Sequence, residues 1–142
     1  MELQIVNIRQ AGLLKMFGFR WKTLHWYNDN ERESEKPLLF IGDEVKNHNG
    51  YDCSRISAPT VALALQWLRH EKKYKMCICE YRGDTIKTSY GNVTDDKWGR
   101  AETYEEAEIA LLDMLLEIIE AKFYEDVGVE KEVRLEDEKI FK

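Results

Sequence analysis

Two cysteines have the residue type and the spacing of metal ligands. Cys77 and Cys79 stand two apart in a segment rich in strand-forming residues, so both thiols are expected on one face of a strand. His48, Cys53 or His70 would then complete a four-ligand zinc site. The spacing is not that of a recognised zinc knuckle, however, and free cysteine is often simply buried. The sequence therefore predicts no metal and no cofactor, and leaves open whether the cysteines bind anything.

Motifs of catalytic sites are missing from the sequence. It contains no GxxxxGK phosphate loop, no GxGxxG after a strand, no HExxH and no GxSxG. The three histidines, His25, His48 and His70, are spread along the chain, and nothing in the sequence places them next to an acid. We therefore expect a protein without enzymatic activity.

Aromatic and basic residues are interleaved in one N-terminal segment, Phe19 to Tyr27, which is predicted to be a strand. Its Arg20, Trp21, Lys22 and Trp26 are typical of proteins that stack on the bases and hold the phosphates of single-stranded nucleic acid. Alternatively, the aromatic residues fill a core from both faces of the strand. We favour the core, because no second strand of this kind follows and the net charge of −6 repels polyanions.

The elements that must position these residues are clearest in the middle of the chain. Ser57 is expected to cap a helix from about Pro59 to Glu71, whose apolar residues fall on one stripe. A hairpin follows, with strands from Tyr74 to Tyr81 and from Thr85 to Val93 around a glycine turn.

The last predicted helix is apolar around most of its circumference. The capping box Thr103-Tyr104-Glu105-Glu106 starts this helix, which runs to about Phe123. Apolar residues cover roughly 260° of it, whereas a surface helix buries a stripe of about 100°. Either a sheet and the N-terminal helix cover it from two sides, or a second subunit covers the excess. One prediction is therefore a homodimer through this helix, with Ile109 and Leu116 in the contact.

The N-terminal part supplies the remaining elements. Asn7 is expected to cap a helix from Ile8 to Phe17, which Gly18 closes in the left-handed conformation. The aromatic strand then pairs with a short strand from Pro37 to Ile41, and residues 42–56 form an irregular connection. The predicted fold class is α+β, with an antiparallel sheet of about four to five strands, three helices and a central α-β-β-(β)-α unit.

Length and composition suit one domain. The chain has 142 residues, 44% hydrophobic and 34% charged, which is typical of a globular protein. We expect a single α+β domain over residues 1–124 and a charged tail over 125–142, in which Val127 to Leu135 alternates like an edge strand. The sequence lacks the layout of a signal peptide and an apolar run long enough to cross a bilayer, so we predict a cytoplasmic protein without a membrane partner.

Three stretches resemble a known family. Ala58-Pro59-Thr60, Trp67-Leu68-Arg69 and Tyr104-Glu105-Glu106-Ala107 are similar to the APT, WLRE and YEEALEAGL motifs of short uncharacterised proteins encoded by gut bacteria and their phages. The likeness covers roughly the central half of the chain and implies no known activity. The sequence departs from the family pattern at His70 and from Glu108 to Leu111.

The order of helix, strands and helix is also similar to that of double-stranded-RNA-binding domains, as an analogy of fold. Those domains hold phosphates with lysines near the start of the last helix, whereas Glu105 and Glu106 stand there in this chain. We therefore predict no binding of duplex RNA.

These observations together favour a non-catalytic protein of phage or mobile-element type that binds another, unknown protein. The expected contact residues are Gln66 and Arg69 on the polar side of the first central helix, with Ile109 and Leu116 on the last helix. The alternative function is binding of single-stranded nucleic acid through the aromatic and basic N-terminal strand.

Overall fold

The computed structural model describes residues 3–50, 54–82 and 86–126. In chain order the elements are α1 (Ile8–Met16), β1 (Thr23–Asn28), the 3-10 turn η1 (Asp29–Glu31), β2 (Leu39–Lys46), β3 (Arg55–Ala58), α2 (Val61–Glu71), β4 (Met76–Arg82), β5 (Ile86–Asn92), β6 (Lys97–Ala101) and α3 (Tyr104–Asp126). The predicted α+β class is confirmed, as is the central order of helix, three strands and helix. None of the described helices has both the length and the apolarity that a membrane span requires.

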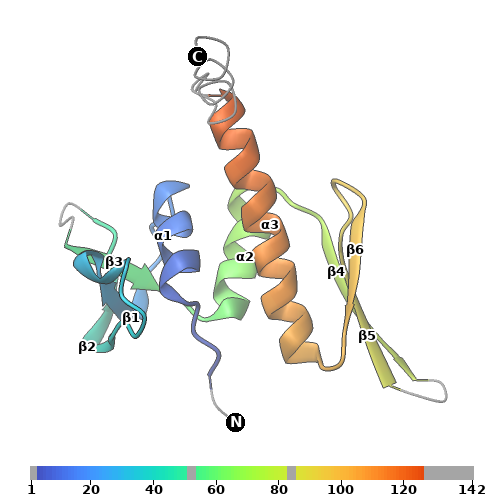
Figure 1. Ribbon diagram of the computed structural model, residues 1–142, viewed down its shortest axis with the longest axis horizontal. Coiled ribbons are helices and arrows are strands. Elements are labelled where there is room, and N and C mark those ends of the chain that lie inside the picture. Colours follow the sequence, from blue (N-terminus) through green and yellow to red (C-terminus); the bar gives the residue numbers. More distant parts are fainter. Residues whose placement is uncertain (1–2, 51–53, 83–85, 127–142) are drawn as a thin grey trace, which may run out of the picture.

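The strands form two separate sheets rather than the single sheet that the sequence predicts. One has the order β2-β1-β3 and the other the order β4-β5-β6, and both are antiparallel. The three helices lie between the sheets (Figure 1). The prediction of four to five strands in one sheet was wrong because α2 carries the chain from the first sheet across to the other side of α3, where β4 pairs only with the hairpin that follows it.

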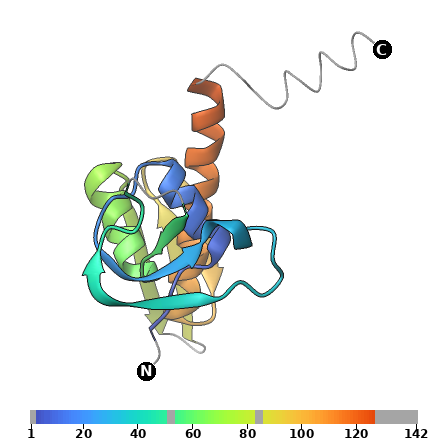
Figure 2. The same cartoon turned by 90° about the vertical axis from the view of Figure 1, so that its left-hand side faces the viewer.

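Helix α3 is the centre of the core. Its inward residues have no exposed surface: Ala107, Leu111, Leu112, Leu115 and Leu116. Sheet β4-β5-β6 packs on one side of α3, and α1 and α2 pack on the other. Helix α3 is thus covered from two sides by its own chain, which accounts for its wide apolar surface. Its last turns extend beyond the remaining elements (Figures 1 and 2).

The helix ends follow the predicted caps with one exception. The Asn7 side chain accepts a hydrogen bond from the Gln10 amide, and Gly18 has a φ of +99°, so both signals around α1 are confirmed. Thr60, not Ser57, caps α2, since its Oγ1 accepts a hydrogen bond from the Leu63 amide at 3.1 Å. Ser57 lies in β3, where pairing with β1 holds its backbone.

The strands of the first sheet begin and end elsewhere than predicted. β1 starts only at Thr23, β2 continues to Lys46, and β3 begins within the segment 42–56 that was expected to be irregular and ends at Ala58. The tertiary pairing of β2 and β3 on the two edges of β1 makes these segments strands, although their composition gives little signal. The edge strand predicted over residues 127–135 lies outside the described residues, and α3 itself continues two residues beyond the predicted domain boundary at 124.

Candidate functional site

A groove lies between α2 and β4, with α3 along its base. It is a cavity of about 250 Å³, lined by Ala62, Leu65, Gln66, Arg69, Met76, Cys77, Ile78, Tyr104, Glu108 and Leu111. The structure therefore brings together Gln66 and Arg69, which the sequence predicts as contact residues, and places both on its rim as exposed side chains. Tyr104 and Glu108 were not among the predicted contact residues, because only the packing of α3 beside α2 brings them to the cavity that Gln66 and Arg69 line.

Strand β4 gives the groove its second wall. Helix α2 and strand β4 each pack against α3, and residues of all three elements line the cavity. Among the described strands, β4 pairs only with β5, which makes β4 an edge strand. An edge strand presents backbone donors and acceptors that another extended chain can use. Met76 and Ile78 are half-buried against the core, so the wall also has an apolar component.

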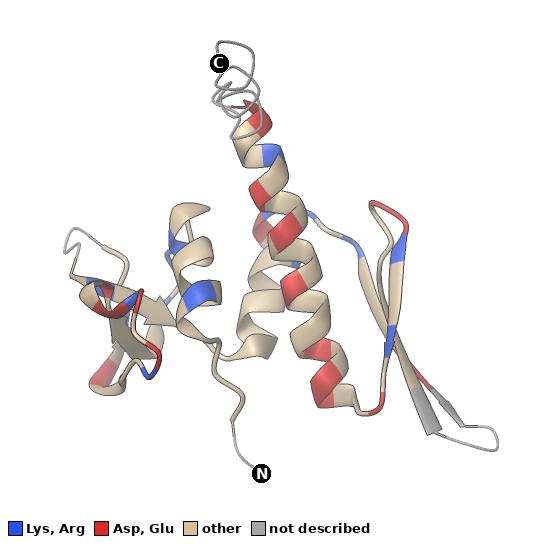
Figure 3. Ribbon diagram, in the orientation of Figure 1, with Lys and Arg blue, Asp and Glu red and all other residues tan. Residues whose placement is uncertain are grey.

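The groove carries opposite charges at its two ends. Arg69 stands near the end of α2, and Lys72, Lys73 and Lys75 follow in the short connection to β4. The first turns of α3 carry acidic residues instead, as Figure 3 shows by the blue connection and the red start of α3. Burial, and secondarily the charge of Glu105, raise the pKa of Glu108. An extended ligand in the groove would therefore meet a basic end and an acidic end.

The two predicted contact residues on α3 differ in exposure. Ile109 is 37% exposed, whereas Leu116 is 0% exposed and belongs to the core. The placement of Leu116 on a contact surface was therefore wrong, because α3 turns this residue toward the rest of its own chain. Dimerisation through the exposed part of α3 stays a prediction.

The predicted nucleic-acid residues do not all line one cavity. Arg20 and Trp21 line a cavity of about 280 Å³ with Trp67 and Lys72, whereas Trp26 lines a different cavity on the first sheet. Lys22 is exposed and lines neither of these two cavities.

Trp26 is also poorly placed for stacking on a base. Phe40 stacks on its ring with centroids 4.4 Å apart, and the Arg55 guanidinium lies 4.1 Å from its centroid. The Trp21 ring touches Phe19 and His70 at tilted and edge angles. Binding of single-stranded nucleic acid stays a prediction that rests on Trp21 and its basic neighbours.

The cysteine pair lies as its spacing predicts, on one face of β4. The Sγ atoms of Cys77 and Cys79 are 3.0 Å apart, and the hydrogen bond between the thiols is the main cause that raises the pKa of Cys77. Cys79 is exposed and Cys77 half-buried. His70 lies on α2, His48 follows β2, and Cys53 lies outside the described residues. Within the described residues, no group of three or more His, Cys, Asp or Glu side chains could hold a metal ion.

His48 is a buried histidine without a partner. It is 3% exposed, and neither ring nitrogen has a hydrogen-bond partner among the described residues. Burial, followed by the charges of Lys46 and Arg55, lowers its pKa below the ordinary 6.5. An interaction with the backbone of Thr23 partly offsets this lowering of the pKa, but its geometry does not meet that of a hydrogen bond to either ring nitrogen. No pattern in the sequence predicts this burial, since nothing distinguishes His48 from His25 and His70.

The lowered pKa of His48 predicts a loss of stability in mild acid. The unfolded chain binds a proton at pH values near 6.5 and somewhat below, where the folded chain does not, so the free energy of unfolding should fall as the pH falls through this range. Urea unfolding of the protein and of His48→Gln between pH 7.5 and 5 tests this. The variant should lose less stability over the same interval, and equal losses would contradict the prediction.

Comparison with protein-family models, with curated proteins and with solved structures finds no match for this chain. The resemblance to a family of short proteins from gut bacteria and phages therefore stays a prediction.

Proposed function

We propose that this protein is a non-catalytic interaction module that holds an extended segment of a partner protein in the groove between α2 and β4. The observation that carries the proposal is the edge strand β4 standing beside a cavity. Peptides that add a strand to a sheet edge gain affinity from backbone hydrogen bonds and specificity from pockets for alternate side chains. The groove offers both features within one surface.

The shape and lining of the groove indicate what the partner segment carries. Leu65, Met76, Ile78 and Leu111 give the cavity an apolar interior. A volume of about 250 Å³ suits one or two apolar side chains rather than a whole small-molecule ligand, for which pockets are commonly about 300 to 1,000 Å³. The partner segment should therefore place an apolar side chain into the cavity.

The charge at the groove ends adds a second requirement. Arg69 and the lysines of the connection between α2 and β4 favour an acidic residue at one end of the partner segment. Glu105 and Glu108, at the start of α3, disfavour an acidic residue at the other end. The proposed ligand is an extended peptide with an apolar residue flanked on one side by an acidic residue.

Selection from a library of displayed peptides tests the proposal. Enriched peptides should share the apolar and acidic pattern, and NMR titration with one of them should shift the amide signals of Met76, Cys77 and Ile78. Ala62→Trp should abolish binding, since Ala62 is an exposed residue of the groove wall and the indole would fill the cavity. Arg69→Glu should weaken binding by about tenfold by placing like charges together.

Matched variants outside the groove serve as controls. Ala121→Trp adds the same side chain to an exposed position of α3, and Arg100→Glu reverses a charge on β6, the opposite edge strand of the same sheet. Both should bind the peptide as the unchanged protein does. Failure to enrich any peptide, signal changes away from β4, or an equal loss in the control variants would each refute the proposal.

A further inference from the structure

A second cavity lies at an irregularity of the first sheet. Its volume is about 370 Å³, and it is lined by Trp26, Ile41, Gly42, Asp43, Glu44, Lys46, His48 and Arg55. In the ladder of β1 and β2, His25 pairs with Ile41 and Thr23 with Lys46, so residues 42–45 stand opposite the single residue Leu24. Strand β2 therefore bulges at the cavity. Bulges of this kind are common beside binding sites, where they redirect side chains.

The backbone around His48 is fixed by a buried polar network. The His48 amide donates a hydrogen bond to Ser57 Oγ at 2.9 Å, and the neighbouring Asn49 side chain bonds both the Ser57 amide and the Phe19 carbonyl. The position of His48 at the cavity wall is thus set by contacts that do not use its ring. A ring that the fold holds rigidly but leaves unsatisfied has a free-energy cost, because a buried polar group without a partner is destabilising.

The ring of His48 faces the bulge. Its Cε1 atom lies 3.6 Å from the position that a Cβ atom would take on Gly42, which lines the cavity. The same Cβ would lie 3.1 Å from the Leu24 carbonyl oxygen, so glycine allows the close approach of β2 here. A half-turn of the imidazole about its Cβ–Cγ bond exchanges Cε1 with Nε2. A ring nitrogen would then face Gly42 and the cavity, where a ligand atom would satisfy it.

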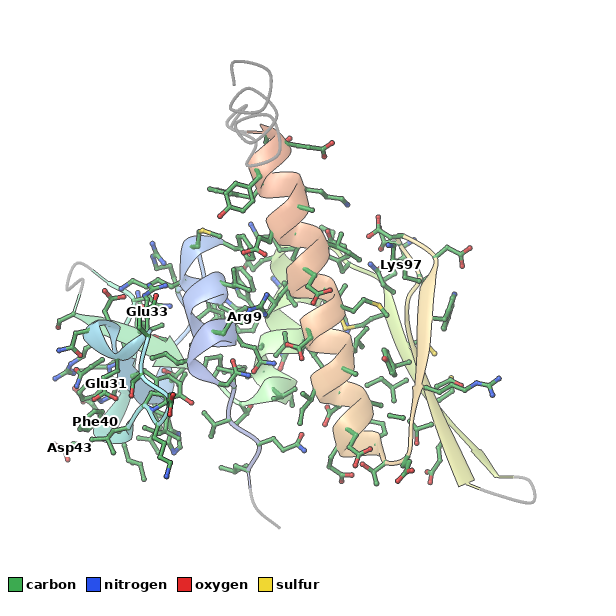
Figure 4. All side chains as sticks on the ribbon, in the orientation of Figure 1. Arg9, Glu31, Glu33, Phe40, Asp43 and Lys97 are labelled. Atoms are coloured by element: carbon green, nitrogen blue, oxygen red, sulfur yellow. The ribbon has the colours of Figure 1, made fainter. Side chains whose placement is uncertain are left out.

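Two positively charged side chains, Lys46 and Arg55, line the cavity beside His48 and contribute to lowering the pKa of its ring. The Arg55 guanidinium carbon lies 4.1 Å from the centroid of the Trp26 ring, a cation–π contact that helps to position the side chain at the cavity. Asp43 and Glu44 also line the cavity and, like Lys46, are exposed to solvent, whereas Arg55 is half-buried. Figure 4 places Phe40 and Asp43 at this end of the molecule, far from Lys97 on β6.

We propose that the cavity at the β2 bulge binds the oxyanion group of a small molecule, a phosphate or a carboxylate, through Lys46, Arg55 and the ring of His48. Arginine and lysine are the usual partners of such groups, and hydrogen bonds to an ionised acceptor are the stronger ones. The volume exceeds what one oxyanion needs, so the cavity can also hold the part of the ligand that carries it. This site is independent of the groove at β4, since the two cavities share no lining residue.

NMR titration of the complete chain with inorganic phosphate, and separately with acetate, tests the proposal at constant ionic strength. One or both anions should shift the His48 ring and Trp26 indole signals along a saturable curve, and the anion that saturates identifies the class of oxyanion. Lys46→Met should weaken that binding by about tenfold or more, as expected for the loss of a charge-assisted contact. Lys46 is exposed, so its replacement should leave the fold intact.

Lys97→Met is the matched control, because Lys97 is an exposed lysine on the other sheet. It should leave the saturation curve unchanged. Shifts that stay linear with both anions, shifts that spare His48, or an equal loss of binding in Lys97→Met would overturn the proposal.

Discussion

Leu116→Glu is expected to prevent the protein from folding. Leu116 has no exposed surface and lies in the cluster that joins α3 to the rest of the core. Truncating a buried leucine alone costs about 2 to 5 kcal/mol, and a buried carboxylate without a partner adds a desolvation cost. The sum is comparable with the total stability of a small domain, about 5 to 15 kcal/mol. Far-ultraviolet circular dichroism and a thermal melt should show no cooperative transition for this variant.

Ile109→Glu is the control for this prediction on the same helix. Ile109 is 37% exposed, so a glutamate there keeps contact with water and should change the stability by less than about 1 kcal/mol. A cooperative melt of Leu116→Glu near that of Ile109→Glu would contradict the buried position of Leu116. The mass of Ile109→Glu in solution also tests the predicted dimer, because a dimer held through the exposed part of α3 should become monomeric.

The apolar circumference of α3 illustrates what a helical wheel can and cannot predict. The wheel identified the apolar positions, and five of them are completely buried. It left two alternatives open, cover by a sheet and the N-terminal helix or cover by a second subunit, because residues far apart in sequence, such as Gln10 and Asp113, meet only in the folded protein. The structure has the first kind of cover, with α2 in addition. Asp113 Oδ1 accepts a hydrogen bond from Gln10 Nε2 at 2.7 Å, a contact with another helix that the wheel of α3 does not contain.

Local signals were reliable where the cause was local. The Asn7 cap, the left-handed Gly18 and the hairpin of β4 and β5 all depend on neighbouring residues, and the structure has each of them. Ser57 was assigned wrongly as a cap because Ala58, the residue before Pro59, favours an extended backbone, so Ser57-Ala58 is also compatible with the end of a strand. Only the pairing of β3 with β1 decides between cap and strand. The division of the strands into two sheets could not be predicted either, because it too depends on which strands pair in the folded protein.

The residues of the candidate sites were likewise predictable only where the signal lies within one element. Gln66 and Arg69 were predicted from the polar side of one helix, and they do lie together on the rim of a groove. Glu108 on α3 and Ile78 on β4 complete the groove, and no pattern in the sequence indicates that these two elements lie beside α2. The isolation of His48 is still less predictable, since it depends on what its ring fails to contact.

Asn49→Ala is expected to have the largest effect among changes to buried polar residues. Asn49 is 1% exposed; its amide nitrogen donates to the Phe19 carbonyl at 3.1 Å, and its oxygen accepts from the Ser57 amide at 2.8 Å. Alanine would take this partner from the Ser57 amide, whereas the Phe19 carbonyl would still accept a hydrogen bond from Arg20 Nη1 at 3.0 Å. A buried group left unsatisfied costs about 1 to 3 kcal/mol, and the loss of one further hydrogen bond about 0.5 to 1.5 kcal/mol. We expect a loss of about 2 to 4 kcal/mol in the free energy of unfolding, measured by urea denaturation.

Asn49→Asp separates the two hydrogen bonds, because a carboxylate can still accept from the Ser57 amide but cannot donate to Phe19. Asn47→Ala is the neighbouring control, since the Asn47 side chain is half-buried and accepts a hydrogen bond from the Asn49 amide at 2.9 Å. It should cost about 1 kcal/mol. An Asn49→Ala variant no less stable than Asn47→Ala would mean that the network does not hold the segment. In that case the unpartnered ring of His48 would have no rigid support, and the cavity at the β2 bulge would not be a preformed site.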